Sequence, residues 1–348
     1  MSFSYLPKYI LFHLCSFMDL QSHATFSLVN KKYYTTFSSI REIFAIIKQN
    51  NPNAISHQSI SKMIKHTEKK YNIGMLNFVL IKENISIETI KLLVENKSNL
   101  NLMDKYKYSP LHFACKNHNV TMEVIRYMVE NKSEINSKNH YNSLPLHYAS
   151  KNKQISMEII RYFVENKSEL NVIDGYGKNT VLQVLIQNRN VTPDIVKLLI
   201  ENKSNVELYD CNVNSVLHLA CEKEVISFEM VKYLVDIKSD ISLINRYLEN
   251  PLHYACKNKS INLETIKYLV ENKSSLNLIN YYKNYIPLHY AVRNKNISVE
   301  IIKYLIESKS DLNLKNNLNV PLYKEIRKKF GDDKSIKELL NEYYCHIF

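Results

Sequence analysis

The dipeptide Leu-His returns at an almost constant interval through most of this chain. It stands at positions 111, 146, 217, 252 and 288, and Leu182-Gln183 occupies the one gap in the series. The steps between successive leucines are 35, 36, 35, 35 and 36 residues. One more step backward reaches Leu76-Asn77, and one more step forward reaches Leu322-Tyr323. A fixed period of this length is the signature of a repeat array, so the chain is expected to fold as stacked copies of one small unit.

Each copy begins with the features of a helix start. In the copy at Pro251, the proline suits the first helical position because its missing N–H is not needed there. Asn250 precedes it and can cap the helix with its side-chain oxygen. Leu252 and Ala255 then fall on one helical face. These residues predict a short first helix with one buried side.

A second helix is predicted after a polar loop at residues 257–262. Ile266, Leu269 and Val270 recur at spacings of three and four residues, which indicates an amphipathic helix over about 263–272. Neither helix can bury its apolar side alone. Stacking of neighbouring copies completes the core, so the expected product is a solenoid with one long continuous surface.

The start of each copy resembles the ankyrin repeat, whose signature is T-P-L-H-x-A. Here the phrase appears as SPLHFA, LPLHYA, NPLHYA and IPLHYA, with SVLHLA as a variant. The resemblance implies an all-α ankyrin-repeat helical solenoid with short β-hairpin-like turns over residues 71–348. This array would hold about seven repeats and a C-terminal partial or capping repeat. It also implies a surface that binds another protein.

Two departures from the ankyrin pattern concern loop geometry. The period exceeds the family's 33 residues, and the extra residues are assigned to the loop between the helices. The family also places a glycine after the second helix, where this chain has the phrase ENKS with a lysine at the equivalent position. A left-handed residue other than glycine costs about 1 kcal/mol, and the neighbouring Asn is the cheaper candidate for it. The lysines concerned are Lys97, Lys132, Lys167, Lys203, Lys273 and Lys309.

The repeated histidines and cysteines are interpreted as structural. The resemblance implies that the histidine hydrogen-bonds its local turn. Cys115, Cys221 and Cys256 share a position that Ser150 and Val292 also fill, which is typical of a small packing site. No CxxC pair occurs and the chain has only 4 glycines, which argues against a zinc cluster and against a glycine-rich phosphate or dinucleotide loop. We therefore expect no metal, no cofactor and no enzyme active site.

Tyrosines gather just before the helix pairs, where an ankyrin array projects its hairpin tips. Tyrosine is a favoured interface anchor because it offers a large contact area with few rotatable bonds. Packing of neighbouring hairpins against each other is the equal alternative. The predicted target-binding residues are Tyr106, Tyr108, Tyr141, Tyr176, Tyr247 and Tyr282.

Residues 1–40 do not follow the repeat and resemble an F-box. The matching elements include an initial Leu-Pro pair, an apolar helical stripe and the phrase SLVNK at residues 27–31. The acidic residue common after Leu-Pro is missing. The resemblance implies docking to the Skp adaptor of a Skp–cullin–F-box ubiquitin ligase. Its adaptor-binding residues would be Leu6, Pro7, Ile10, Leu14, Phe17 and Leu20.

Other interpretations of this segment stay open. It could be a helical cap of the solenoid, and its apolar stretch at residues 9–18 has some features of a signal peptide. Residues 41–70 are predicted to form a helical connector that Pro52 interrupts. The favoured function is a substrate receptor, with the ankyrin surface selecting an unknown target protein. The alternative is a non-catalytic scaffold whose N-terminus is only a cap.

The remaining features concern membrane attachment, nucleic-acid binding and the cellular compartment. Cys345 is fourth from the end before a terminal Phe348, which fits a prenylation pattern except that His346 stands where an aliphatic residue is usual. Membrane attachment is expected only if Cys345 is lipidated. The net charge is +12, but the lysines are spread along the whole chain and do not form one block, which argues against nucleic acid. The cysteine usage favours the cytoplasm, with the nucleus as an alternative.

Overall fold

The computed structural model describes residues 61–62, 64–65, 74–81 and 86–345, apart from 155, 176, 224, 226 and 238. The F-box-like segment at 1–40 lies outside the described residues. So does the predicted connector at 41–70, except for its four residues at 61–62 and 64–65. The described residues therefore belong almost entirely to the repeat array.

The described residues form two compact units. The first contains those up to His140 together with Leu144–Ile159, and the second contains Tyr141–Ser143 together with the residues from Ile160 onward. The helices of the first unit are α5 (Met75–Leu80), α6 (Ile87–Glu95), α7 (Pro110–Lys116), α8 (Met122–Glu130) and α9 (Pro145–Lys151), and α10 (Met157–Glu165) crosses the division. Those of the second unit are α11 (Val181–Ile186), α12 (Pro193–Glu201), α13 (Val216–Glu222), α14 (Phe228–Asp236), α15 (Pro251–Lys257), α16 (Leu263–Glu271), α17 (Pro287–Arg293), α18 (Val299–Glu307), α19 (Leu322–Phe330) and α20 (Lys334–Cys345).

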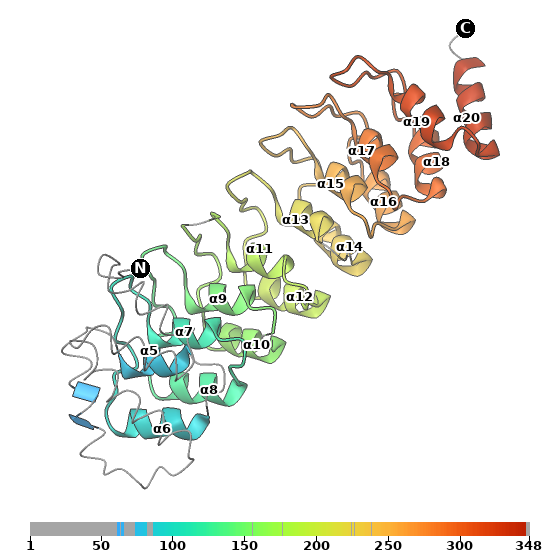
Figure 1. Ribbon diagram of the computed structural model, residues 1–348. Helices are drawn as coiled ribbons and strands as arrows, with labels where there is room; N and C mark the ends of the chain where they lie inside the picture. The colour runs from blue at the N-terminus through green and yellow to red at the C-terminus, as the bar shows by residue number, and fades with distance from the viewer. Residues whose placement is uncertain are drawn as a thin grey trace, which may run out of the picture. The chain divides into compact units, whose positions relative to one another are not determined.

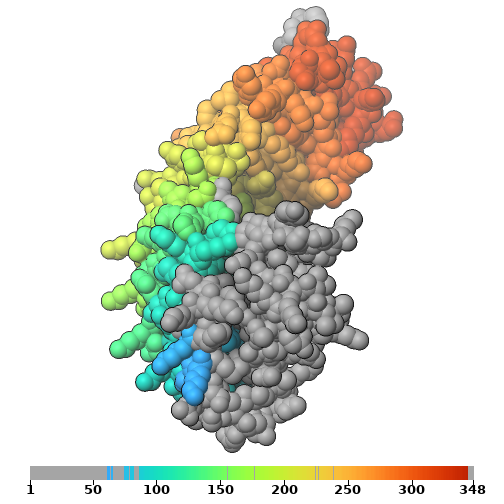
Figure 2. Space-filling view, turned by 60° about the vertical axis from the view of Figure 1, so that its left-hand side comes forward, coloured from blue at the N-terminus to red at the C-terminus, as the bar shows by residue number. Residues whose placement is uncertain are grey.

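Each unit is built of stacked helix pairs. In the second unit, α13 packs on α15 and α15 on α17, while the partner helices α14, α16 and α18 pack on one another in a second layer (Figure 1). The repeats of this unit follow one another in chain order across the face that Figure 2 shows. Within the described ranges no strand forms, and one isolated bridge joins Lys315 to Pro321. The expectation of an all-α repeat solenoid is confirmed.

The helix starts follow the sequence pattern. Asn250 has an extended backbone, and its side-chain oxygen accepts the backbone N–H of His253 at 3.2 Å. Pro251 occupies the first helical position, and Leu252 and Ala255 are fully buried. The second helix of this repeat ends at Glu271, one residue before the predicted end.

In six of the described repeats a short hairpin precedes the first helix and is closed by one Asn or Asp. The side chain of Asn245 accepts the backbone N–H groups of Tyr247 and Glu249, at 2.9 and 3.0 Å. Neighbouring hairpins of the second unit are also joined, since the N–H of Tyr281 donates to the carbonyl of Tyr247 at 2.9 Å. The hairpin tips are therefore held in a row by backbone hydrogen bonds. The equivalent closing residues are Asp104, Asp174, Asp210, Asn280 and Asn316.

The small-residue position of the first helix lies in the core, as predicted. Cys115, Cys221 and Cys256 are fully buried, as is Ser150 in its repeat, and Val292 is almost fully buried. Burial raises the pKa of all three thiols because a thiolate would lose its hydration there.

The turn after the second helix differs from the expectation. The lysine of each ENKS phrase takes the left-handed conformation, as at Lys273 with φ 70°, whereas Asn272 keeps φ −87°. The asparagine has another role, because its side-chain nitrogen donates at 2.9 Å to the carbonyl of Tyr268, which also accepts the backbone N–H of Asn272 at 3.1 Å. The expectation that the asparagine adopts the left-handed turn is wrong. The same lysine geometry occurs at Lys97, Lys132, Lys167, Lys203 and Lys309.

Candidate functional site

The predicted tyrosines fall into different environments. In the first unit, Tyr106 is half-buried beneath the ammonium of Lys105, and the hydroxyl of Tyr108 lies 2.7 Å from that of Tyr148. Tyr148 lies on α9, and Lys105 precedes Tyr106 in the same hairpin, so neither contact joins adjacent hairpins. Tyr141, in the second unit, is half-buried. The predicted contact residue Tyr176 lies outside the described residues.

Tyr247 and Tyr282 come together in the second unit. Both stand on hairpin tips, and their ring centroids are 5.7 Å apart. Tyr247 is half-buried, whereas 62% of Tyr282 is exposed. They line a cavity of about 520 Å³ between these hairpins and the helices α13, α15 and α17. Its other lining residues are Glu222, Glu249, Tyr254, Lys257, Asn258, Lys259, Asn280, Lys283 and Tyr290.

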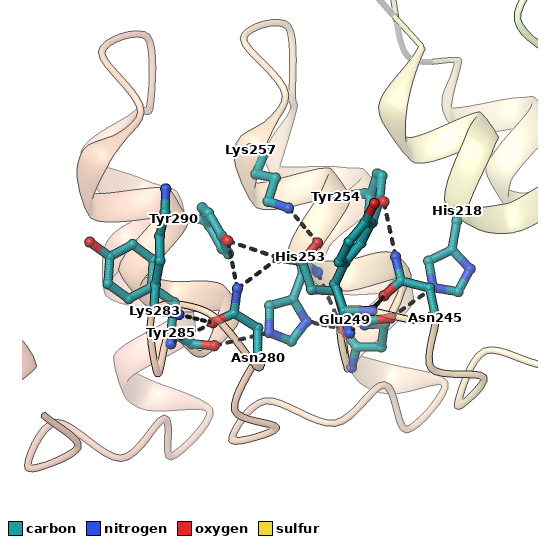
Figure 3. Close-up of polar contacts among 12 residues, drawn as sticks. His218, Asn245, Glu249, His253, Tyr254, Lys257, Asn280, Lys283, Tyr285 and Tyr290 are labelled. Atoms are coloured by element: carbon teal, nitrogen blue, oxygen red, sulfur yellow. Dashed lines mark hydrogen bonds and ion pairs between the residues drawn. The ribbon is translucent and has the colours of Figure 1, made fainter. Parts of the chain in front are cut away.

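The cavity wall is built around the ammonium group of Lys257. This nitrogen lies 4.7 Å from the ring centroid of Tyr254 and 4.3 Å from that of Tyr290, so it sits between two aromatic faces (Figure 3). The side chain leaves the last turn of α15, where a cation also interacts favourably with the helix dipole. It reaches back to the carboxylate of Glu249 at 2.5 Å. About a third of the Lys257 side chain, 34%, stays exposed toward the cavity.

Glu249 is the buried partner of this arrangement, with only 4% of its side chain exposed. Its Oε1 accepts hydrogen bonds from the hydroxyl of Tyr290 at 2.8 Å and from the side-chain nitrogen of Asn280 at 2.9 Å. Desolvation by itself would raise the pKa of Glu249, but the ammonium of Lys257 and these two donors outweigh it and hold the pKa below its usual value. The carboxylate is therefore ionised and fully partnered.

Asparagine–tyrosine pairs fix the two aromatic rings. The Asn280 side chain donates to the hydroxyl of Tyr290 at 2.8 Å, and that of Asn245 donates to the hydroxyl of Tyr254 at 2.9 Å (Figure 3). Burial raises the pKa of both hydroxyls, and nearby carboxylates, among them Glu249, raise it further. The rings on either side of Lys257 are thus oriented before any partner arrives.

The repeated histidines lie beneath the hairpins as neutral structural groups. The Nδ1 atom of His253 accepts the backbone N–H of Asn250 at 3.2 Å, and its Nε2 faces the carbonyl of Tyr285 at 3.3 Å. A carbonyl can only accept, so Nε2 carries the proton. Burial lowers the pKa of His218, His253 and His289 to about 4, because a charged imidazole would be desolvated. The expected local hydrogen bond of this histidine is present.

A second acid–base pair lies one repeat further along. Arg293 donates from Nε and one terminal nitrogen to the two carboxylate oxygens of Glu325, each at 2.9 Å. The guanidinium lies 4.8 Å from the ring centroid of Tyr285. Here too the acid is satisfied by a base of the chain itself, so neither Glu249 nor Glu325 is left to attract a cationic partner.

The described residues hold neither a metal-binding cluster nor a membrane-spanning helix. No group of three or more His, Cys, Asp or Glu side chains among them could hold a metal ion. None of the helices in this part of the chain is long and apolar enough to cross a membrane.

The comparisons with known proteins agree with this architecture. Three overlapping segments, residues 78–174, 156–245 and 227–316, match the family model described as ankyrin repeats in three copies. The chain belongs to the ankyrin-repeat family. Ankyrin repeats serve as protein-binding modules, and their stacked units present an extended surface for that purpose.

One solved ankyrin-repeat structure provides a comparison of fold. The crystal structure of the human ASB11 ankyrin repeat domain superposes with a TM-score of 0.51 at 18% sequence identity. The match covers 64% of this chain and 92% of that one. At this level of identity the likeness concerns the fold alone. No curated protein sequence matches the chain.

Reasoning from the sequence missed the acid and the base at the centre of this cavity. Glu249 stands at a repeat position where Tyr108, Ser143, Asn214 and Tyr285 occur in other copies, so a single acid among neutral residues was the available signal. Its pairing with Lys257 was not readable from spacing alone. Eight residues and a helix start separate the two residues, and only the folded hairpin brings the carboxylate under the lysine.

Proposed function

We propose that this ankyrin-repeat protein is a non-catalytic substrate receptor of a Skp–cullin–F-box ubiquitin ligase. The repeat surface around the Tyr247–Tyr282 cavity binds the target protein. The F-box-like segment at residues 1–40 docks to a Skp-type adaptor, and catalysis belongs to the partner subunits. This role places the chain in the cytoplasm, with the nucleus as the alternative.

Target binding is supported by the preorganised wall of the cavity. The rings of Tyr254 and Tyr290 are held by asparagine side chains, and Lys257 is held between them. A surface ordered in advance loses less conformational entropy when a partner docks. Tyr247 and Tyr282 add aromatic area at the tips, where rigid side chains make good interface anchors.

Adaptor binding is supported by the order of residues in the N-terminal segment. The initial Leu-Pro pair, the apolar stripe that follows and the SLVNK phrase occur in the F-box order within about 30 residues. A ligase receptor needs two binding parts in one chain, and this segment supplies the part that the repeats do not.

A plain ankyrin scaffold is the alternative. In that case the N-terminal segment would only cap the apolar end of the array, as terminal repeats do. Lipidation of Cys345 would add membrane attachment to either role, and mass measurement of the C-terminal peptide would detect it.

The deciding experiment is a pull-down of the full chain with a Skp-type adaptor. The variant Leu6→Ala/Pro7→Ala/Phe17→Ala should abolish micromolar binding, because the loss of three buried anchors costs several kcal/mol, on the order of 3–6. The matched control Tyr247→Ala/Tyr282→Ala should bind the adaptor like the parent chain. Absence of binding by the folded parent would leave the scaffold as the function.

A further inference from the structure

The cavity beside Lys257 has the aromatic composition of a cation-binding site, but the position where a ligand cation would bind already holds the Lys257 ammonium. Tyrosine faces attract ammonium and guanidinium groups, and four tyrosines line this cavity. The position between Tyr254 and Tyr290 already holds the Lys257 ammonium. A cationic ligand would therefore meet a positive charge at the point where the rings would otherwise stabilise it.

The cavity has two acidic side chains, one buried and one exposed. Glu249 is buried and accepts hydrogen bonds from Lys257, Asn280 and Tyr290. Glu222 is the other acidic residue that lines the cavity, and it is exposed at the cavity opening, here called the rim together with the exposed Lys259 and Lys283. The ion pair of Lys257 and Glu249 has no net charge. The exposed charged residues of the rim therefore determine the charge that a ligand meets.

Two further lysines give this rim a positive excess. Lys259 and Lys283 both line the cavity and are exposed. Among the residues that the structure describes, neither ammonium has a carboxylate within ion-pair distance, and Lys283 rests 5.7 Å from the ring centroid of Tyr285. Against them stands the single carboxylate of Glu222. The exposed part of Lys257 adds hydrogen-bond donors to the cavity floor.

We propose that this cavity binds an acidic side chain carried by an extended segment of the target protein. The carboxylate is received by Lys257, Lys259 and Lys283, and the residues on either side of it lie against Tyr247 and Tyr282. This inference rests on the proposed role of the repeat face in target binding and names the chemistry of that target. A nucleic acid is the less suitable ligand, because a phosphate backbone needs a long row of basic groups, whereas this cavity offers two exposed lysines, Lys259 and Lys283, beside the carboxylate of Glu222.

The test uses the full chain and two matched probes, an alternating Glu-Ala decapeptide and an alternating Gln-Ala decapeptide, each labelled with fluorescein. Fluorescence anisotropy should show saturable binding of the Glu-Ala peptide that weakens as salt is raised. The Gln-Ala peptide should bind at least about tenfold more weakly, since it loses its charge contacts with the lysines of the cavity.

Variants that remove positive charge and a variant that removes negative charge distinguish binding in the cavity from a general attraction of acidic peptides to a basic protein. Lys259→Gln/Lys283→Gln should weaken Glu-Ala binding about fivefold to tenfold, and Glu222→Gln should strengthen it by about twofold to fivefold. The control Lys232→Gln/Lys337→Gln removes the same charge from exposed positions on α14 and α20 and should change the affinity by less than about twofold.

Several outcomes would overturn the inference. Equal binding of the two peptides, equal loss in both lysine pairs, or tighter binding of a uridine decanucleotide than of the Glu-Ala peptide would each exclude a cavity specific for an acidic protein segment. The adaptor pull-down separates this result from the proposed function. A chain that binds the adaptor but neither peptide keeps its receptor role and loses this ligand chemistry. A chain that binds the Glu-Ala peptide through the rim but no adaptor keeps the ligand chemistry and loses the ligase role.

Discussion

The hydroxyl of Tyr290 donates a hydrogen bond of 2.8 Å to the carboxylate of Glu249, which stands 41 residues earlier in the chain. This bond joins the first helix of one repeat to the hairpin of the preceding repeat. The same carboxylate also accepts from Lys257 on the helix that follows it. Glu249 therefore ties two stacked repeats together and at the same time fixes the floor of the cavity.

Glu249→Ala should lower the free energy of unfolding by about 2 kcal/mol, because buried donors of Asn280 and Tyr290 lose their acceptor. The cost stays below the 3–5 kcal/mol of a fully buried ion pair, since the exposed part of Lys257 keeps its hydration. Urea unfolding of the full chain, followed by circular dichroism, measures the shift. The control Glu271→Ala alters an exposed acid on α16 and should stay within about 0.5 kcal/mol of the parent. Equal effects of the two variants would contradict the bridging role of Glu249.

The buried histidines predict a loss of stability in mild acid. The pKa of His253 is lowered to about 4 in the folded chain, whereas an unfolded histidine titrates near 6.5. The unfolded state therefore binds the extra proton first. The stabilising contribution is fully present above about pH 6.5 and is lost as the pH falls toward 4, at about 1.4 kcal/mol per pH unit for one histidine.

His253→Gln should reduce that pH dependence by about one proton while it preserves the fold. Gln183 occupies the equivalent position in another repeat, where it accepts the N–H of Thr180 and donates to the carbonyl of Leu208, each at 2.8 Å. Glutamine can thus accept the N–H at the helix start and donate to a backbone carbonyl, as the histidine does, without titrating. Urea midpoints at pH 7, 6 and 5 give the slope. A variant that keeps the parent's slope would show that His253 does not carry this proton linkage.

The cysteines should differ in reactivity toward a thiol reagent. Cys211 is half-exposed, whereas Cys115, Cys221 and Cys256 are buried and their thiol pKa values are raised. Iodoacetamide labelling of the folded chain, followed by peptide mapping, should modify Cys211 and spare the three buried thiols until urea is added. Labelling of Cys256 as fast as Cys211 in the folded chain would contradict the assigned packing role.

The fold could be predicted because one local pattern is repeated many times. Pro251, Leu252 and Ala255 each carry a short-range signal, namely a helix start and a buried face, and the copies at intervals of 35 or 36 residues reinforce it. A single copy would have left the choice between a repeat and an isolated helix pair open.

The site could be predicted only in part because its contacts run between repeats. The tips Tyr247 and Tyr282 were found by their position before a helix pair, which is a local signal. The contact of Tyr290 with Glu249 depends on how two repeats stack, and no spacing within one repeat encodes it. The second-helix turn shows the same limit, since Asn272 was the better left-handed residue by local preference alone. Its side chain bonds the carbonyl of Tyr268, and the lysine takes the strained position instead.

Lys273→Gly should stabilise the chain, and Asn272→Gly should destabilise it. Lys273 has φ 70°, a conformation that costs a residue other than glycine about 1–2 kcal/mol. Glycine removes that strain but adds entropy to the unfolded chain, so the expected net gain is about 0.5–1 kcal/mol. Asn272 has φ −87°, and its side chain donates to the carbonyl of Tyr268. Glycine at this position adds entropy to the unfolded chain, loses that hydrogen bond and relieves no strain, so it should lower the free energy of unfolding by about 1 kcal/mol. Urea midpoints of the two variants should therefore move in opposite directions. A gain at Asn272 with none at Lys273 would place the left-handed residue at the asparagine after all.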